Sequence, residues 1–197
     1  MTKQELSKRV RELGEWHHSH RFPHGIVTGG PPGDHMPGMK MTRLVQSGAF
    51  SKPSYPMVLD LGANSGIISM WFVDNKHSHV VAIERGERYF PQLELAVKAK
   101  GYEGRIDCRN QDIYDADFGE NLYDLVLLLG VLHHISSECR MEVLLACHRA
   151  LKIGGEMVLE TRTILPGIRL LTQAGFRRAK KLYDDPSYGK SGWKAKK

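Results

Sequence analysis

Residues 58–69, with the sequence VLDLGANSGIIS, constrain the fold of this chain more than any other segment. An apolar run leads into two glycines, and a helical pattern begins directly after them. Gly62 and Gly66 let the backbone turn tightly and approach a ligand without an intervening Cβ. Ser65 or Asn64 is expected to cap the helix. The segment therefore predicts a buried strand, a glycine turn and a helix, with a nucleotide-type pocket at the carboxyl end of the strand.

The two following strand signals carry side chains suited to such a pocket. Residues 79–84 form an apolar run that ends in Glu84. This acid lies about 20 residues after the glycines, the offset expected of a carboxylate that accepts hydrogen bonds from ribose hydroxyls. A third strand over residues 105–109 leads to Asp112 and Ile113, where a polar side chain suits an adenine amine.

The second half of the pattern completes an α/β domain. Residues 123–129 are almost wholly apolar, as a strand buried on both faces should be, and they lead to His133 and His134. A helix is expected over residues 136–150, and a glycine turn then leads into a fifth strand over residues 156–161. Alternating strands and helices predict a doubly wound, mostly parallel sheet with helices on both faces.

Together these motifs resemble those of class I S-adenosylmethionine-dependent methyltransferases. The glycine loop, Glu84, Asp112, the end of the fourth strand and the turn over residues 151–155 match family motifs in the expected order. The resemblance covers roughly residues 55–176 and implies a Rossmann-like fold, S-adenosylmethionine as cofactor and a methyltransferase activity. The cofactor-binding residues that it implies are Lys40, Asp60, Gly62, Asn64, Gly66, Glu84, Arg85, Asp112, Ile113 and Leu129.

A narrower resemblance includes the N-terminal region. Residues 16–44 contain three short motifs similar to the lead-in of a subgroup that includes the tRNA wobble-uridine carboxymethyltransferases. Lys40 matches a cofactor-contacting lysine of those enzymes. His133 stands where they carry a tyrosine that reads the carboxylated cofactor, and His35 lies near a tryptophan of their lead-in. These two departures favour ordinary S-adenosylmethionine over the carboxylated cofactor.

His133 and His134 are the candidate catalytic residues. Methyl transfer needs a nucleophile aligned with the methyl carbon, and a hydroxyl acceptor also needs a base near neutral pH. Both histidines follow the fourth strand, where the transferred methyl is expected. The alternative is that one of them only forms a hydrogen bond at the strand end. No metal is expected, because the ten histidines and three cysteines lack the spacing of metal ligands.

A dinucleotide oxidoreductase is the alternative within this fold class, because it uses the same turn and acid. The spacing of residues 62–66 is not Gly-x-Gly-x-x-Gly, however, and the later motifs also favour the methyltransferase.

The net charge of +6 lies entirely in residues 177–197, which hold eight basic and two acidic side chains. Such a segment attracts phosphate, but a solvated, partly frayed tail is the favoured interpretation. The sequence therefore predicts methyl transfer to an oxygen or nitrogen of a small-molecule acceptor. An RNA methyl- or carboxymethyltransferase is the first alternative, and a non-catalytic S-adenosylmethionine-binding protein is the second.

The expected organisation has three parts. Residues 1–54 form an N-terminal helix over residues 3–15, a loop over residues 22–39 and a helix from Lys40, with residues 16–40 acting as a mobile lid. The methyltransferase core spans residues 55–176, and a basic strand and tail occupy residues 177–197. This short C-terminal end predicts an acceptor site that is either open or closed mainly by the N-terminal loop.

Composition places the chain among globular proteins. It is 41% hydrophobic and 25% charged, and it contains no apolar run of about 18 residues that would span a membrane. The absence of an apolar leader and of a disulfide framework predicts a cytoplasmic location.

Overall fold

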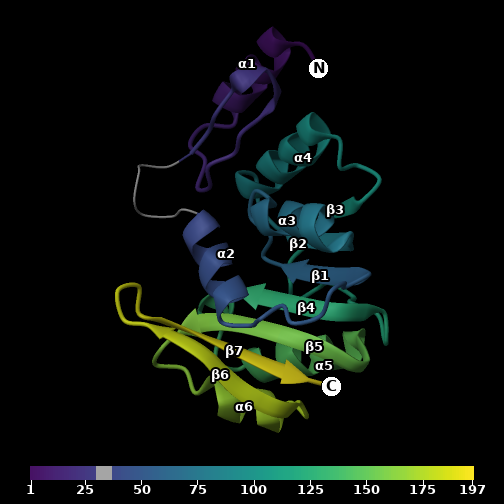
Figure 1. The fold of residues 1–197 in the computed structure, drawn as a ribbon, viewed down its shortest axis with the longest axis vertical. Helices are drawn as coiled ribbons and strands as arrows, with labels where there is room; N and C mark the ends of the chain where they lie inside the picture. Colours follow the sequence, from purple (N-terminus) through teal and green to yellow (C-terminus); the bar gives the residue numbers. More distant parts are fainter. Residues whose placement is uncertain (30–36) are drawn as a thin grey trace.

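A seven-stranded sheet with helices on both faces organises the computed structural model, which describes residues 1–29 and 37–197 (Figure 1). The strands are β1 (Met57–Leu61), β2 (His79–Glu84), β3 (Ile106–Asn110), β4 (Tyr123–Leu129), β5 (Leu151–Arg162), β6 (Arg177–Asp185) and β7 (Lys190–Lys196). The helices are α1 (Lys3–Glu12), α2 (Pro37–Gln46), α3 (Ile67–Lys76), α4 (Tyr89–Lys100), α5 (Arg140–Ala150) and α6 (Gly167–Gln173), with short 3₁₀ turns η1 (Pro23–Gly25) and η2 (Leu132–His134). The predicted doubly wound fold is confirmed.

The strand order is β3-β2-β1-β4-β5-β7-β6, and the first five strands in the chain are parallel. The chain winds outward from β1 to β3 and then returns to the other side of β1 with β4. The order therefore reverses between β1 and β4. In open α/β sheets such a reversal leaves a crevice at the carboxyl ends of the strands, which is where ligands bind.

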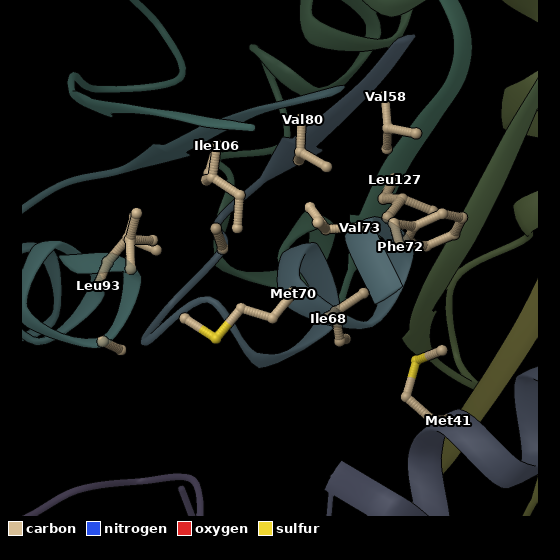
Figure 2. Packing of buried hydrophobic residues seen from close by; sticks show 14 of the residues in the cluster. Met41, Val58, Ile68, Met70, Phe72, Val73, Val80, Leu93, Ile106 and Leu127 are labelled. Atoms are coloured by element: carbon tan, nitrogen blue, oxygen red, sulfur yellow. The ribbon is translucent and has the colours of Figure 1, made fainter. Parts of the chain in front are cut away.

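Two apolar layers cover the sheet, one on each face. Val58 and Leu127 belong to the layer under α1–α4, whereas Leu59 and Leu128 belong to the layer under α5 and α6. Figure 2 shows the first layer, where Phe72 of α3 lies near strand side chains. Because successive side chains point to opposite faces, a strand buried on both faces must be apolar throughout, as β4 is.

Several element boundaries differ from the sequence prediction by a few residues. The first helix ends at Glu12 because Gly14 adopts a left-handed conformation, whereas residues 3–15 were expected to be helical. α2 begins at Pro37, three residues before the expected start at Lys40. α5 begins at Arg140, because the backbone N–H of Cys139 closes a turn on the carbonyl of Ser136.

The third and fifth strands are also shifted. β3 covers residues 106–110, one residue later than expected. β5 begins at residue 151 and includes the glycines for which a turn was predicted. Its pairing with β4 shifts register between Tyr123 and Leu125, so the turn is an irregularity within a longer strand.

The predicted side-chain cap of α3 is wrong. Gly66 occupies the cap position with φ +80° and no side-chain hydrogen bond. The Asn64 side chain instead accepts a hydrogen bond from the Ser65 N–H at 2.7 Å. A Cβ on Gly66 would lie 2.4 Å from a methyl carbon of Leu93, so glycine is needed here for packing against α4.

The expectation of a frayed C-terminal tail is also wrong. β7 lies between β5 and β6 and is antiparallel to both. Trp193 and Ala195 are buried in the core, and only 5% of Lys194 is exposed. Pairing on both sides satisfies the backbone of β7, and its apolar side chains extend the layer under α5 and α6.

The N-terminal segment over residues 16–29 is packed rather than extended into solvent. Trp16, His20 and Phe22 are buried and their rings contact one another, with centroids 5.4–5.5 Å apart. The predicted lid function of this segment remains a prediction, and His35 lies outside the described residues. Within the described ranges, no helix has the length and apolar character needed to cross a membrane.

Candidate functional site

A cavity of about 540 Å³ lies at the carboxyl ends of β1, β2 and β4. It is lined by the predicted residues Lys40, Asp60, Gly62, Asn64, Glu84, Arg85, Asp112, Ile113, Leu129, His133 and His134. Gly66 is the one predicted site residue that does not line the cavity, because it packs under α4. Since these residues come from segments far apart in the sequence, the topology of the sheet is what brings them together.

Asp60 lies at the floor of the cavity and only 3% of it is exposed. Its carboxylate accepts a hydrogen bond from the Ser69 hydroxyl at 2.6 Å. Burial raises the pKa of Asp60 to about 6, although Ser69 and the Lys40 ammonium oppose the shift. A cationic ligand group beside Asp60 would favour the ionised carboxylate and would itself be stabilised.

Glu84 holds the glycine loop against the end of β2. Its carboxylate accepts hydrogen bonds from the backbone N–H of Asn64 at 2.6 Å and of Arg85 at 2.9 Å. Burial raises the pKa of Glu84, and these two hydrogen bonds together with the Arg85 charge act in the opposite direction. A carboxylate has about four acceptor positions, so two remain for ligand hydroxyls.

Asp112 forms an ion pair with the Arg85 guanidinium at the rim of the cavity. The Arg85 side chain is 67% exposed, whereas that of Asp112 is only 22% exposed. Ile113 lies beside Asp112 in the same wall. This wall therefore combines an apolar surface with a carboxylate that can accept hydrogen bonds from an amine.

Lys190 lines the same cavity, although the sequence pattern assigned it to a solvated tail. Its Nζ lies 3.8 Å from Glu160 Oε1, and Lys40 Nζ lies 3.0 Å from the same oxygen. The other Glu160 oxygen accepts a hydrogen bond from the Tyr183 hydroxyl at 2.6 Å. Burial alone would raise the pKa of Glu160, but these neighbours outweigh it and the pKa is lowered.

His133 and His134 lie on η2, directly after β4, with ring centroids 4.2 Å apart. His133 is half-buried, and its Nδ1 lies 3.2 Å from the Thr161 hydroxyl. Burial, reinforced by the charges of His134 and Lys190, lowers the pKa of His133 to about 4. His133 is therefore a neutral imidazole at physiological pH, whereas His134 is exposed to solvent.

The N-terminal segment contributes one wall of the cavity, through residues that the sequence analysis placed within a lid but did not name individually as site residues. His17 and His18 line the cavity. His18 Nδ1 lies 3.3 Å from the Ser65 hydroxyl, and His20 Nε2 lies 2.8 Å from the same atom. Tyr89, Gln111 and Tyr114 complete the additional lining.

The described residues contain no group of three or more histidine, cysteine or acidic side chains placed to hold a metal ion.

Comparison with known proteins identifies the family. A family model described as a methyltransferase domain matches residues 58–155. The tRNA U34 carboxymethyltransferase of Helicobacter pylori (strain J99) is 31% identical over 143 residues, covering 70% of this chain and 53% of the relative. The chain thus spans about half the length of the curated relatives that it matches.

Two solved structures show the same fold at low sequence identity. The N-terminal domain of EvdMO1 with SAH bound has a TM-score of 0.77 at 16% identity, covering 100% of this chain and 97% of that one. The Burkholderia thailandensis 1,6-didemethyltoxoflavin-N1-methyltransferase has a TM-score of 0.65 at 20% identity, covering 81% and 77%. With the glycine loop and the acids at the carboxyl ends of β1 to β3 in place, the chain belongs to the class I S-adenosylmethionine-dependent methyltransferases, the family whose cofactor is S-adenosylmethionine.

Proposed function

We propose that this chain transfers a methyl group from S-adenosylmethionine to an oxygen or nitrogen of a small-molecule acceptor. The observation that carries the proposal is that one cavity combines the carboxylates of Asp60 and Glu84 with the neutral ring of His133. When bound, S-adenosylmethionine supplies an electrophilic methyl carbon attached to a sulfonium. The remaining requirements are to hold this group, orient the acceptor and exclude water.

The residues present fit this cofactor. The two unused acceptor positions of Glu84 suit a pair of ribose hydroxyls, and Asp112 with Ile113 suits an adenine amine and ring. Buried Asp60 suits a cationic amino group. The loop from Gly62 to Gly66 precedes α3, and the N-terminus of a helix favours a carboxylate.

His133 is proposed to orient the acceptor. Its Nδ1 is engaged by the Thr161 hydroxyl, which leaves Nε2 as the ring nitrogen for the acceptor. A neutral Nε2 can accept a hydrogen bond from an O–H or N–H group of the methyl acceptor. This hydrogen bond would direct the lone pair of that oxygen or nitrogen toward the methyl carbon, about 3 to 3.5 Å away. The acceptor proton then passes to the His133 ring, which is only half-buried and can release it to solvent.

The position of the basic residues supports the small-molecule acceptor. Of the basic residues in 177–197, only Lys190 lines the cavity among the described side chains. The RNA alternative is supported by a different observation, the identity of about 30% to enzymes named as tRNA U34 carboxymethyltransferases. The two acceptor classes therefore have to be separated by experiment.

The test is to incubate the purified chain with methyl-labelled S-adenosylmethionine and either a small-molecule extract or total RNA. We expect label in the small-molecule fraction. We also expect His133→Asn to lower turnover while calorimetry shows unchanged binding of S-adenosylhomocysteine. Label that appears only in RNA would replace this proposal with the RNA alternative. Cofactor binding without label in either fraction would favour a non-catalytic binding protein.

A further inference from the structure

A second cavity, of about 280 Å³, lies at the carboxyl end of β7, away from the cofactor cavity. Its polar lining consists of Ser51, Glu156, Arg178, Lys180, Lys194 and Lys196. The register places Lys196 opposite Glu156, and Lys190 opposite Arg162 at the cofactor end of the sheet. At about 3.3 Å per residue, six residues of β7 separate the two ends by roughly 20 Å. A group bound in this cavity therefore lies too far from the cofactor cavity to be the group that receives the methyl.

The lining of this cavity holds four cations and one carboxylate. That carboxylate, Glu156, is already engaged by the Tyr55 hydroxyl at 2.6 Å and by Lys194 Nζ at 2.9 Å, with Lys196 Nζ 3.6 Å away. Arg178 and Lys180 have no carboxylate within ion-pair distance among the described residues. The lining therefore carries a surplus of positive charge that no described acid balances.

Lys194 is the buried member of this positively charged lining, because its side chain is only 6% exposed. A charged ammonium in such a position loses hydration that an anion could replace. The Lys194 ammonium donates a hydrogen bond to the Ser51 hydroxyl at 2.8 Å. Burial lowers the pKa of Lys194, and Lys180 and Lys196 add to this, while Glu156 opposes it. An anion placed over Lys194 would stabilise the charged form that burial disfavours.

Arg178 is held in an unusual backbone conformation beside the cavity. Its φ is +52°, and the pairing of β6 with β7 shifts register between Arg177 and Lys180. Such a bulge redirects a side chain at some conformational cost. Lysines on an edge strand also discourage aggregation, which accounts for exposed Lys180 but not for the strained Arg178 or the buried Lys194.

We propose that this cavity binds a phosphate group. The guanidinium of Arg178 presents a planar set of donors that matches phosphate oxygens, and Lys180 and Lys196 add two ammonium groups. Lys194 and the Ser51 hydroxyl form the base of the site. The phosphate belongs either to a small phosphorylated molecule or to a nucleic-acid backbone, and both have the same recognition chemistry.

The test uses pyrophosphate as the probe and the full chain as the protein. Calorimetry is performed on the wild type, on the double variant Arg178→Gln/Lys180→Gln, and on the control Lys181→Gln. Lys181 is on the same strand but pairs with Asp184 and does not line the cavity. We expect pyrophosphate to bind about tenfold or more weakly to the double variant, and within about twofold of wild type to the control.

The amide NMR shifts that pyrophosphate causes should centre on Ser51 and the end of β7. All variants should bind S-adenosylhomocysteine like the wild type, which shows that the fold is retained. Undetectable binding to the wild type, or equal losses in the double variant and the control, would overturn the proposal. Competition by a short uridine oligonucleotide would identify a nucleic-acid phosphate as the source, and its absence would identify a small phosphorylated ligand.

Discussion

The buried His20 predicts a specific loss of stability in acid. His20 is fully buried, and its Nε2 lies 2.8 Å from the Ser65 hydroxyl. Burial, with a smaller contribution from the charge of Lys100, lowers the pKa of His20 to about 3 from its ordinary value of 6.5. Between these two values the unfolded chain binds a proton that the folded chain does not, so the free energy of unfolding falls as the pH decreases.

The size of the effect follows from the two pKa values. The contribution of His20 is complete above pH 6.5 and is lost progressively as the pH falls from 6.5 toward 3. At pH 5, the unfolded state gains about 2 kcal/mol relative to pH 8 from this one side chain. For a domain of this size, that corresponds to a decrease in Tm of roughly 4 to 8 °C.

Urea unfolding of the wild type and of His20→Asn at pH 8 and pH 5 measures this contribution. The nearby Trp16 ring, 5.4 Å from the His20 ring, provides a fluorescence signal. Other groups titrate in both proteins, so the difference between their pH dependences isolates His20. We expect this difference to be about 2 kcal/mol. Equal pH dependences in the wild type and His20→Asn would refute the reasoning.

Three further predictions follow from the site and the fold. Glu84→Ala should weaken S-adenosylhomocysteine binding in calorimetry by roughly 10- to 150-fold, with exposed Glu87→Ala unchanged, and equal affinities would contradict the proposed ribose contact. Gly66→Ala should lower the free energy of unfolding in urea by about 1 to 3 kcal/mol more than the control Gly86→Ala. Gly86 also has a positive φ, but a Cβ there would have no neighbouring atom within 4 Å, so equal losses would show that packing does not explain the need for glycine at position 66. Deleting residues 190–197 should abolish cooperative thermal unfolding, whereas an unchanged Tm would mean that β7 does not support the sheet.

The parallel half of the fold was predictable because its signals are local. A strand buried on both faces is apolar along its length, and β4 shows this directly. Residues at the carboxyl ends of parallel strands meet at one edge of the sheet, so Asp60, Glu84 and Asp112 could be grouped before their positions were known. Their individual hydrogen bonds depend on side-chain geometry, which no sequence pattern contains.

The antiparallel end was mispredicted because its signal is non-local. A run of lysines indicates a solvated tail when it is considered alone. The structure shows that Glu156 and Glu160, four residues apart on β5, pair with Lys194 and Lys190, four residues apart on the antiparallel β7. This reversed spacing of opposite charges was present in the sequence and could have indicated the pairing.

The position of β7 also orders the assembly of the molecule. β5 can pair with β4 as soon as both are available, but its other edge stays unpaired until residues 190–196 arrive. An unpaired strand edge is open to association with other chains, so a partly folded molecule is most vulnerable along β5. Lys190 is the first residue of β7, so the cofactor cavity gains this wall only when that edge closes. The same strand pairing thus covers the open edge of β5 and places Lys190 in the wall of the cofactor cavity.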